Sequence, residues 1–251
     1  MKIALITDLH ANREAFEAVL ADARAWGCDK LALLGDFVGY GGDPAWLVSQ
    51  VQQLVADGAI AVKGNHDDAV AKGPHSSMRE DARAAVTWTR EQLSAEHLDF
   101  LGKLPLHVKF ERCLFVHANA YAPADWEYIQ GRAEAVRSMQ ATQSIYTFCG
   151  HMHEPMLYHL SGTGKAGEFT PVAGVEIPLL DNRQWLVVPG SCGQPRDGNP
   201  AACYARFDTN TALLSFQRVP YDYESAAARI LATGMPASVA QRLAERLGHG
   251  N

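Results

Sequence analysis

The sequence lacks the features that mark secreted, membrane-spanning and nucleic-acid-binding proteins. Its 251 residues hold no apolar stretch near the roughly 20 residues that a membrane helix needs. The opening MKIALITD has only the short apolar run IALI before Asp8, which is too short for a secretory signal. The formal net charge is −6, whereas a surface that binds nucleic acid normally carries a basic excess. We therefore expect neither a membrane nor a nucleic acid among its partners.

Cysteine is scarce and has no spacing typical of a disulfide framework. The five cysteines are odd in number, and no two of them form a CxxC motif. They are Cys28, Cys113, Cys149, Cys192 and Cys203. Reduced, buried thiols are typical of cytoplasmic proteins, so the expected location is the cytoplasm.

The composition that is present is that of an ordinary globular enzyme. A chain of 251 residues, 47% of them hydrophobic, can bury a full core. No internal repeat and no low-complexity linker divides it, and the Gly/Thr-rich segment 161–168 looks like a loop excursion. We predict a single domain over residues 1–251 and leave the oligomeric state open.

The first third of the chain alternates between strand and helix patterns. Apolar runs of strand length at 2–7, 31–35 and 59–62 are separated by two helical stretches. The first helix has apolar residues from 16 to 23 at helical spacing and ends at Gly27, and the second runs from Pro44 towards Val55. This βαβαβ order predicts parallel strands with right-handed crossovers.

The rest of the chain is helical and then dominated by strands. Residues from about 77 to 104 have a helical pattern, and LHVKF and CLFVHA indicate an antiparallel pair. Two hairpins are predicted, VEIPLLDNRQWLVV turning at Asp181–Asn182 and YARFDTNTALLSFQRV turning at Asp208–Asn210. Two short helices close the chain, the second after Pro236. The pattern predicts an α/β protein with a mostly β core of two sheets and helices outside.

Aspartate, asparagine and histidine recur where the predicted strands become loops. In FCGHMHEP, two histidines at i and i+2 can point to the same side of an extended chain. TDLH, LLGD, KGNHD and FVHAN place similar side chains after four other strands. Each motif alone is more often a turn or a buried core residue, but five in register with strand ends indicate one site. The candidate ligands are Asp8, His10, Asp36, Asn65, His117, His151 and His153.

These ligand types predict a centre with two metal ions. The set mixes oxygen and nitrogen donors without a thiolate, and it is too large for one tetrahedral zinc. Asp36 is the natural bridge, because its strand lies between those that carry Asp8 and Asn65. Two metals ~3.5–4 Å apart clamp a phosphoryl group and lower the pKa of bound water towards ~7. The predicted reaction is therefore attack of a metal-bound hydroxide on a phosphoester.

His66 and Asp67 follow Asn65 directly and suit a catalytic role. Because neighbouring side chains point in different directions, we expect His66 to turn away from the metals and act as general acid for the leaving oxygen. Asp67 would orient the His66 ring. The alternative is that His66 only supports Asn65.

Three further residues are candidate contacts for the substrate phosphate. Asn12 follows DLHA, Tyr40 lies in FVGYG, and Arg196 lies in GQPRDG. Each also has a structural reading, with Asn12 as a helix N-cap, Tyr40 as loop packing and Arg196 as a salt-bridge partner.

The motifs together resemble one known family. DLH, GD, GNHD, VHA and GHMH, in this order and spacing, are similar to the calcineurin-like metallophosphoesterases. LLGDFVGYGGDP and VPGSCGQPRDG resemble a bacterial branch related to symmetrical diadenosine tetraphosphatases and serine/threonine phosphatases. With YDYESAAARI and RLAERLG, the resemblance covers nearly the whole chain.

The resemblance implies a four-layer α/β/β/α sandwich with a dinuclear manganese, iron or zinc site. The family's ligands fall on the same candidate positions, and its catalytic histidine falls on His66. Three departures bear on the substrate: VHAN stands in place of VHG, GHMH in place of GHTH, and the phosphate-gripping arginine after GNHE is absent.

The functional prediction is hydrolysis of a small phosphodiester, nucleotide or dinucleoside polyphosphate, with manganese preferred over iron or zinc. Diesters are favoured because no second arginine is evident to hold a dianionic monoester. A phosphomonoesterase or a protein serine/threonine phosphatase is the alternative within the same chemistry. A catalytically silent interaction module on the same fold, or a purely structural metal site, would be another class of function. The complete ligand set and the His66–Asp67 pair favour the enzyme.

Overall fold

The computed structural model describes residues 1–74, 78 and 80–251 of the chain. The strands are β1 (Lys2–Ile6), β2 (Lys30–Leu33), β3 (Ile60–Ala61), β4 (His107–Phe110), β5 (Cys113–Val116), β6 (Tyr146–Phe148), β7 (Pro155–Ser161), β8 (Ala166–Phe169), β9 (Glu176–Pro178), β10 (Arg183–Pro189), β11 (Ala202–Asp208) and β12 (Leu213–Val219). The helices are α1 (Arg13–Ala25), α2 (Pro44–Ala56), α3 (Asn65–Lys72), α4 (Glu80–Glu91), α5 (Ala95–Lys103), α6 (Arg132–Gln140), α7 (Tyr223–Leu231) and α8 (Ala237–His249).

The strands form two six-stranded mixed sheets. The first has the order β3-β2-β1-β11-β12-β9, and the second has the order β4-β5-β6-β10-β7-β8. Strands β1, β2 and β3 pair in parallel, which confirms the predicted βαβαβ unit, while β11 joins β1 in the antiparallel sense. The predicted pairs β4–β5 and β11–β12 are antiparallel, as expected.

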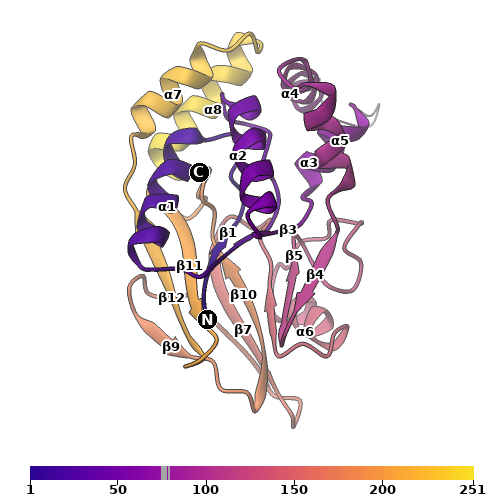
Figure 1. Cartoon of the computed structure of the whole chain (residues 1–251), viewed down its shortest axis with the longest axis vertical. Helices are drawn as coiled ribbons and strands as arrows, with labels where there is room; N and C mark the ends of the chain where they lie inside the picture. The colour runs from indigo at the N-terminus through magenta and orange to yellow at the C-terminus, as the bar shows by residue number, and fades with distance from the viewer. Residues whose placement is uncertain (75–77, 79) are drawn as a thin grey trace.

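The two sheets pack face to face and carry helices on their outer faces (Figure 1). Alternation along β1 shows how one strand serves two layers: Ala4 and Ile6 pack with α1 and α2, while Ile3 and Leu5 pack against the second sheet. On the far side of the second sheet, Met139 of α6 packs against that sheet. The predicted four-layer α/β/β/α sandwich is confirmed.

Local signals define most helix ends. The Asn12 side chain accepts a hydrogen bond from the Ala15 amide and caps α1, and Pro44 begins α2. The region predicted as helical from residue 77 contains two helices, because Ser94 ends the first stretch and caps α5; residue 77 itself lies outside the described residues. Within the described part of the chain, no helix is both long and apolar enough to cross a membrane.

Two predictions about the second half of the chain were wrong. VEIPLLDNRQWLVV does not form a hairpin, because β9 pairs with β12 in the first sheet and β10 pairs with β6 and β7 in the second. The Asp181–Asn182 turn therefore lies where the chain crosses between sheets. The segment 161–168 is not a loop excursion, since β7 and β8 pair through Leu160 and Ala166 as a hairpin.

Candidate metal centre

The predicted ligands lie at adjoining ends of the two sheets. Residues that follow β1, β2 and β3 meet residues that follow β5 and β6 of the other sheet. The donor atoms fall into two groups, and within each group all atoms lie within 4.8 Å of one another. One group is Asp8, His10, Asp36 and His153, and the other is Asp36, His117 and His151. Asp36 belongs to both groups, at the position predicted for a bridge.

The distances between donor atoms suit bound ions. His153 Nε2 lies 3.3 Å from Asp8 Oδ1, in the first group. His117 Nε2 lies 3.4 Å from Asp36 Oδ2 and 3.2 Å from Asn65 Oδ1, which places Asn65 beside the second group. Donors at ordinary metal–ligand distances of about 2.0–2.2 Å from a shared ion stand roughly 3 Å apart.

Each histidine of the centre is oriented by a backbone carbonyl on its outer nitrogen. The pairs are His10 Nδ1 with Val38 (3.2 Å), His117 Nδ1 with Leu34 (2.7 Å), His153 Nδ1 with Gln194 (2.6 Å) and His151 Nε2 with Trp126 (2.9 Å). A ring nitrogen that donates to a carbonyl leaves the other nitrogen with a lone pair for a metal. The carbonyls therefore select the tautomer that a metal needs.

The electrostatics of the centre also fit a cation. Asp8 and Asp36 are 0% and 1% exposed, and their ion-pair partners among the described residues are histidines. Burial lowers the pKa of His10, and it lowers the pKa of His151 to about 3, so both rings are neutral at pH 7. Burial also opposes charge on His117, but the Asp36 carboxylate outweighs it and raises the His117 pKa to about 9. The two buried carboxylates thus draw positive charge to the centre, onto His117 in the protein alone, and this O/N donor set suits a transition metal in that role.

Several candidate ligands have strained backbones. Left-handed φ angles occur at Asp8 (52°), His10 (48°), Asp36 (53°), His151 (70°) and His153 (62°). Non-glycine residues rarely adopt this region, and it costs about 1–3 kcal/mol each time. Such concentrated strain is typical of a functional site that the surrounding fold holds in place.

Two glycines of the motifs allow the loops of the centre to pack closely. A Cβ on Gly64 would lie 2.1 Å from Asp36 Oδ1, and one on Gly150 would lie 1.9 Å from Thr7 Oγ1. No side chain fits at either position without moving a ligand loop. These glycines thus serve as close-contact positions.

His66 lies next to the donor groups and contacts a predicted substrate residue. Its Nε2 is 3.1 Å from the Tyr40 hydroxyl, and its backbone amide donates to Asp36 Oδ1 at 2.8 Å. The Tyr40 ring also lies 4.5 Å from the His10 ring, centroid to centroid. Burial lowers the pKa of His66 and raises that of Tyr40.

Asp67 does not orient the His66 ring, and that part of the prediction was wrong. Its carboxylate is fully buried and accepts hydrogen bonds from backbone amides, at 2.9 Å from those of Asp36, Phe37 and Gly64. As the third residue of α3, Asp67 points back at the helix start and binds the neighbouring loop. It therefore holds the Asp36 loop against α3.

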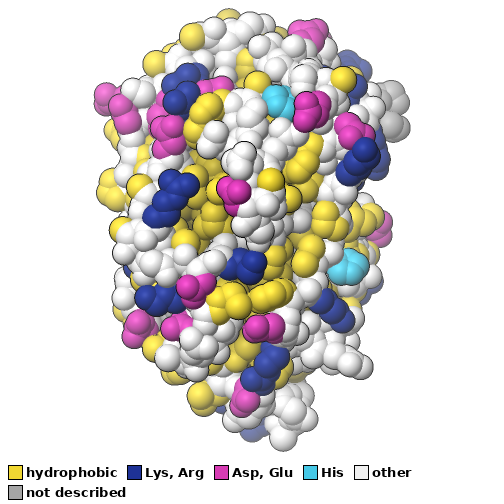
Figure 2. Space-filling view, in the orientation of Figure 1, with side chains coloured by type: hydrophobic (Ala, Val, Ile, Leu, Met, Phe, Trp, Pro, Cys, Tyr) yellow, Lys and Arg dark blue, Asp and Glu magenta, His cyan; other side chains and the backbone are white. Residues whose placement is uncertain are grey.

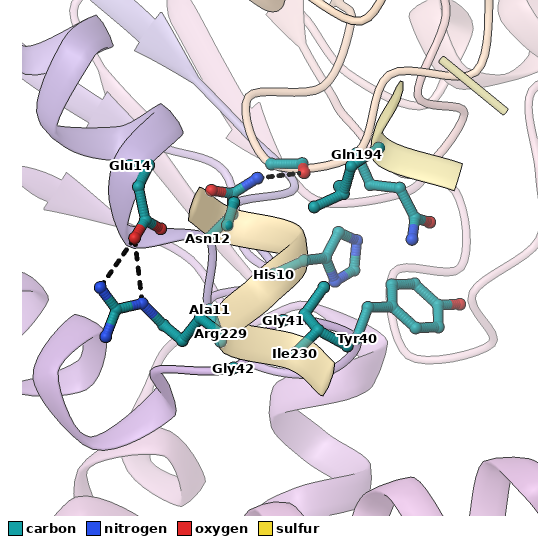
Figure 3. A pocket seen from close by; sticks show the side chains of 13 residues that line it. His10, Ala11, Asn12, Glu14, Tyr40, Gly41, Gly42, Gln194, Arg229 and Ile230 are labelled. Carbon is teal, nitrogen blue, oxygen red and sulfur yellow. Dashed lines mark hydrogen bonds and ion pairs between the residues drawn. The ribbon is translucent and has the colours of Figure 1, made fainter. Parts of the chain in front are cut away.

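Asn12 has the structural role considered for it, as the cap of α1, while its contact with a substrate stays a prediction. Its amide caps α1 and donates to the Gly193 carbonyl at 2.8 Å, and the residue is 3% exposed. Figure 3 shows this bond in a small pocket behind His10. In the same view Glu14 of α1 binds Arg229 of α7 at 2.7 Å, which ties the C-terminal helices to the back of the site.

Arg196 lies at the rim of the centre. Its Nη2 donates to Gln194 Oε1 at 3.1 Å, and its guanidinium carbon lies 5.8 Å from the centre of the Tyr40 ring. Its charge contributes, after burial, to the lowered pKa values of His10 and His66. The salt bridge considered as its alternative role is not found among the ion pairs of the described residues.

The sequence did not point to a loop that covers His151. Tyr128 is 44% exposed, and its ring stacks on that of His151 at 4.0 Å with 12° between the planes. Trp126 supplies the carbonyl for the same ring. The available signal was Asn119, which follows Ala118 in VHAN, where the family has VHG: its side chain accepts from the Ala122 amide, donates to the Glu127 carbonyl and shapes this loop.

Comparisons with known proteins agree with this geometry. Residues 1–212 match the family model of the calcineurin-like phosphoesterase superfamily domain. The chain is 34% identical over 246 residues to an uncharacterised protein of Methanocaldococcus jannaschii, covering 96% of each. A metallophosphoesterase from Sphaerobacter thermophilus has the same fold with a TM-score of 0.86 and 36% identity, over 100% of this chain and 99% of that one. A hypothetical protein from Pyrococcus horikoshii has a TM-score of 0.78 at 20% identity, over 100% and 98% of the two chains. The protein therefore belongs to the calcineurin-like phosphoesterase superfamily and is a metallophosphoesterase.

Proposed function

We propose that this enzyme hydrolyses a small phosphodiester, nucleotide or dinucleoside polyphosphate, with two transition-metal ions held by the candidate ligands. The observation that carries the proposal is the pair of buried donor groups sharing Asp36, with His66 beside them. Manganese is the expected metal, because imidazole nitrogens suit transition metals better than magnesium.

The metal ions and the side chains that bind them have different roles in the proposed reaction. Metal ions in such a centre supply positive charge to the phosphoryl oxygens and activate water at neutral pH. The carbonyl-bound histidines keep their lone pairs aimed inwards, so the site is organised before substrate arrives. Burial of the donor groups excludes competing water from the ligands.

His66 is the proposed proton donor to the leaving oxygen. The Tyr40 hydroxyl holds its ring through Nε2, and an anionic phosphate beside the ring would favour the protonated imidazole that burial disfavours. Arg196 at the rim is the proposed fixed cation for the phosphate. Since one arginine serves one or two oxygens, we favour a diester over a dianionic monoester.

The alternatives differ in what they leave unexplained. A phosphomonoesterase or protein phosphatase would use the same donor groups, and substrate profiling separates these from a diesterase. An interaction module without activity would not need His66 held beside the donor groups by Tyr40 and Asp36. On the face drawn in Figure 2, Lys and Arg are interspersed with Asp and Glu, so we propose a small phosphorylated partner.

The test is a screen of metal-stripped protein reloaded with Mn, Fe, Zn, Ni or Mg. Activity is measured on mono- and diester nitrophenyl phosphates and on dinucleoside polyphosphates, with elemental analysis of the same samples. We expect about two metal ions per chain and the highest activity with Mn. A metal content near zero after reloading would rule out the proposed centre.

A further inference from the structure

An apolar pocket opens beside His66, between α3 and α4. Val70 and Val86 form its base and are also part of the main hydrophobic core, so the base is well packed from below. No Asp, Glu, Lys or Arg side chain lines it within the described part of the chain. Besides Asn65 and His66 at the start of α3, the helical lining consists of Ala69 and Val70 of α3 and of Ala82, Ala85, Val86 and Thr89 of α4.

The α4 side of the pocket follows from helical spacing. Ala82, Ala85, Val86 and Thr89 stand at i, i+3, i+4 and i+7 and so share one face of the helix. Small side chains at 82 and 85 leave open space where larger ones would meet α3. The residues that the structure describes leave this apolar face unfilled.

The inner end of the pocket borders the candidate metal centre. Asn65, His66 and Tyr40 line its inner end. Asn65 Oδ1 lies 3.2 Å from His117 Nε2 of the second donor group, so this end borders the metal centre. If His66 gives its proton to the leaving oxygen, the group carried by that oxygen lies on the His66 side, which is the side of this pocket.

We infer that this leaving-group pocket receives an uncharged group of one or two flat rings, attached through the leaving oxygen. The inference rests on the proposed function. Its cavity volume is about 240 Å³, compared with ~150 Å³ for an apolar cavity that binds benzene. Among the residues that the structure describes, a charged leaving group, such as a nucleotide released from a dinucleoside polyphosphate, would find no cation here. The preferred substrates are therefore phosphoesters of an aromatic or heteroaromatic alcohol.

The reaction step balances without another reactant. A P–O bond forms to the oxygen of water, and the P–O bond to the ring-bearing oxygen breaks. A basic leaving oxygen takes a proton from His66 and departs as the neutral alcohol, whereas an aryl oxide departs first and is protonated by solvent; in both cases the attacking water releases the balancing proton.

The test is binding of a neutral aromatic alcohol, 4-methylumbelliferone, to the full-length protein by calorimetry. A ligand of this size in an apolar pocket binds with a Kd of about 1 mM. Ala82 is exposed on α4, so Ala82→Phe fills the pocket mouth with little risk to folding, and we expect at least about tenfold weaker binding. Ala82→Glu, which places a charge there, should act in the same direction.

The matched control is Ala84→Phe, the same substitution on another face of α4, where Ala84 lines a separate surface hollow with Thr87 and Trp88. It should bind the probe like wild type. The proposal that this pocket binds a neutral aromatic group would be overturned if the wild-type protein failed to bind the probe, or if Ala82→Phe bound it as well as wild type. This would hold even if the enzyme hydrolyses phosphoesters.

Hydrolysis of bis(4-methylumbelliferyl) phosphate, a diester with the same leaving group, tests the role of the pocket. We expect kcat/KM to fall at least about tenfold in Ala82→Phe and not in Ala84→Phe. Unchanged kcat/KM in Ala82→Phe would overturn the leaving-group role. If the probe binds as expected but reloaded wild-type protein hydrolyses no phosphoester, the proposed function fails and the leaving-group role fails with it.

Discussion

At the scale of single residues, Asp36 is shared by the two donor groups. One carboxylate there can neutralise charge on two cations, while the His153 ring serves only one. Asp36→Asn should reduce metal content from about two ions per chain towards zero, whereas His153→Asn should retain about one. Elemental analysis of both variants measures this, and equal losses would mean that Asp36 does not bridge.

The role of His66 is visible in how activity depends on the leaving group. Nitrophenolate departs without protonation, whereas an alkoxide does not. His66→Ala should spare nitrophenyl substrates relatively and slow alkyl or nucleoside esters by roughly 10²–10⁴-fold, with metal content unchanged. The measurement is kcat/KM of His66→Ala and wild type for nitrophenyl substrates and for alkyl or nucleoside esters. A parallel fall for both, with loss of metal, would make His66 a support for Asn65 instead.

Asp67 affects stability, because its buried carboxylate accepts from several backbone amides. Asp67→Asn replaces one acceptor oxygen by a donor and leaves amides unpaired, which should cost about 2–4 kcal/mol of unfolding free energy. Asp68→Asn is the control on the same helix, since its partner Lys72 is exposed and its contact with Lys63 is long at 3.6 Å, so we expect a loss of about 1 kcal/mol. Urea unfolding measures both, and similar losses would contradict the assignment.

The residues of the centre could be predicted, but their partners could not. Asp8 and His10 follow a strand in a pattern that the sequence displays directly. The carbonyls of Leu34 and Gln194 that orient His117 and His153 are 83 and 41 residues away from them. Backbone groups carry no sequence signal, so such contacts become visible only in the fold.

At the scale of elements, the β3–α3 turn holds the Asp36 loop. A methyl group on Gly64 would lie 2.3 Å from the Asp36 amide, so Gly64→Ala must displace that loop. We expect metal loss and a fall in kcat/KM of at least about 100-fold, as for other misplaced catalytic groups.

The control for Gly64 is Gly102 inside α5. A Cβ there would make ordinary contact at 3.7 Å with Ala71, so Gly102→Ala should raise stability by about 0.5–1 kcal/mol and leave activity unchanged. Wild-type activity in Gly64→Ala would show that the turn tolerates a side chain and that this account of it is wrong.

Helices and strands could be predicted where the local hydrophobic pattern was enough to define them, without knowledge of which strands pair. The strand near residues 2–7 and the helix from Pro44 were both found close to their predicted bounds. The 176–189 hairpin failed because a turn signal at Asp181–Asn182 looks the same whether the next strand pairs with its neighbour or joins another sheet. Which sheet a strand joins depends on non-local packing and not on the turn.

At the scale of the whole molecule, the candidate ligands join the two sheets, since Asp8 and Asp36 follow strands of one and His117 and His153 follow strands of the other. Ions that bind only the folded chain stabilise it by about 4 kcal/mol at 1,000 times Kd. Chelation should therefore lower Tm by about 10 °C, and reloading should restore it. Calorimetry with and without chelator measures the shift. Asp36→Asn should show little shift, and an unchanged wild-type Tm would count against a centre that joins the sheets.

The position of β11 between β1 and β12 has a consequence for how the protein is made. On one side β1 pairs with β2 soon after both are synthesised, but its other partner, Phe207 opposite Ile3, comes roughly 200 residues later. A ribosome adding about 5–20 residues per second leaves that strand edge unpaired for roughly ten seconds or more. Unpaired edges invite association with other chains, so the β1 edge is the place where the nascent chain is most open to wrong pairing until β11 is made. The Gln194 carbonyl that orients His153 is also made late, so the first donor group is complete only after most of the chain has been synthesised.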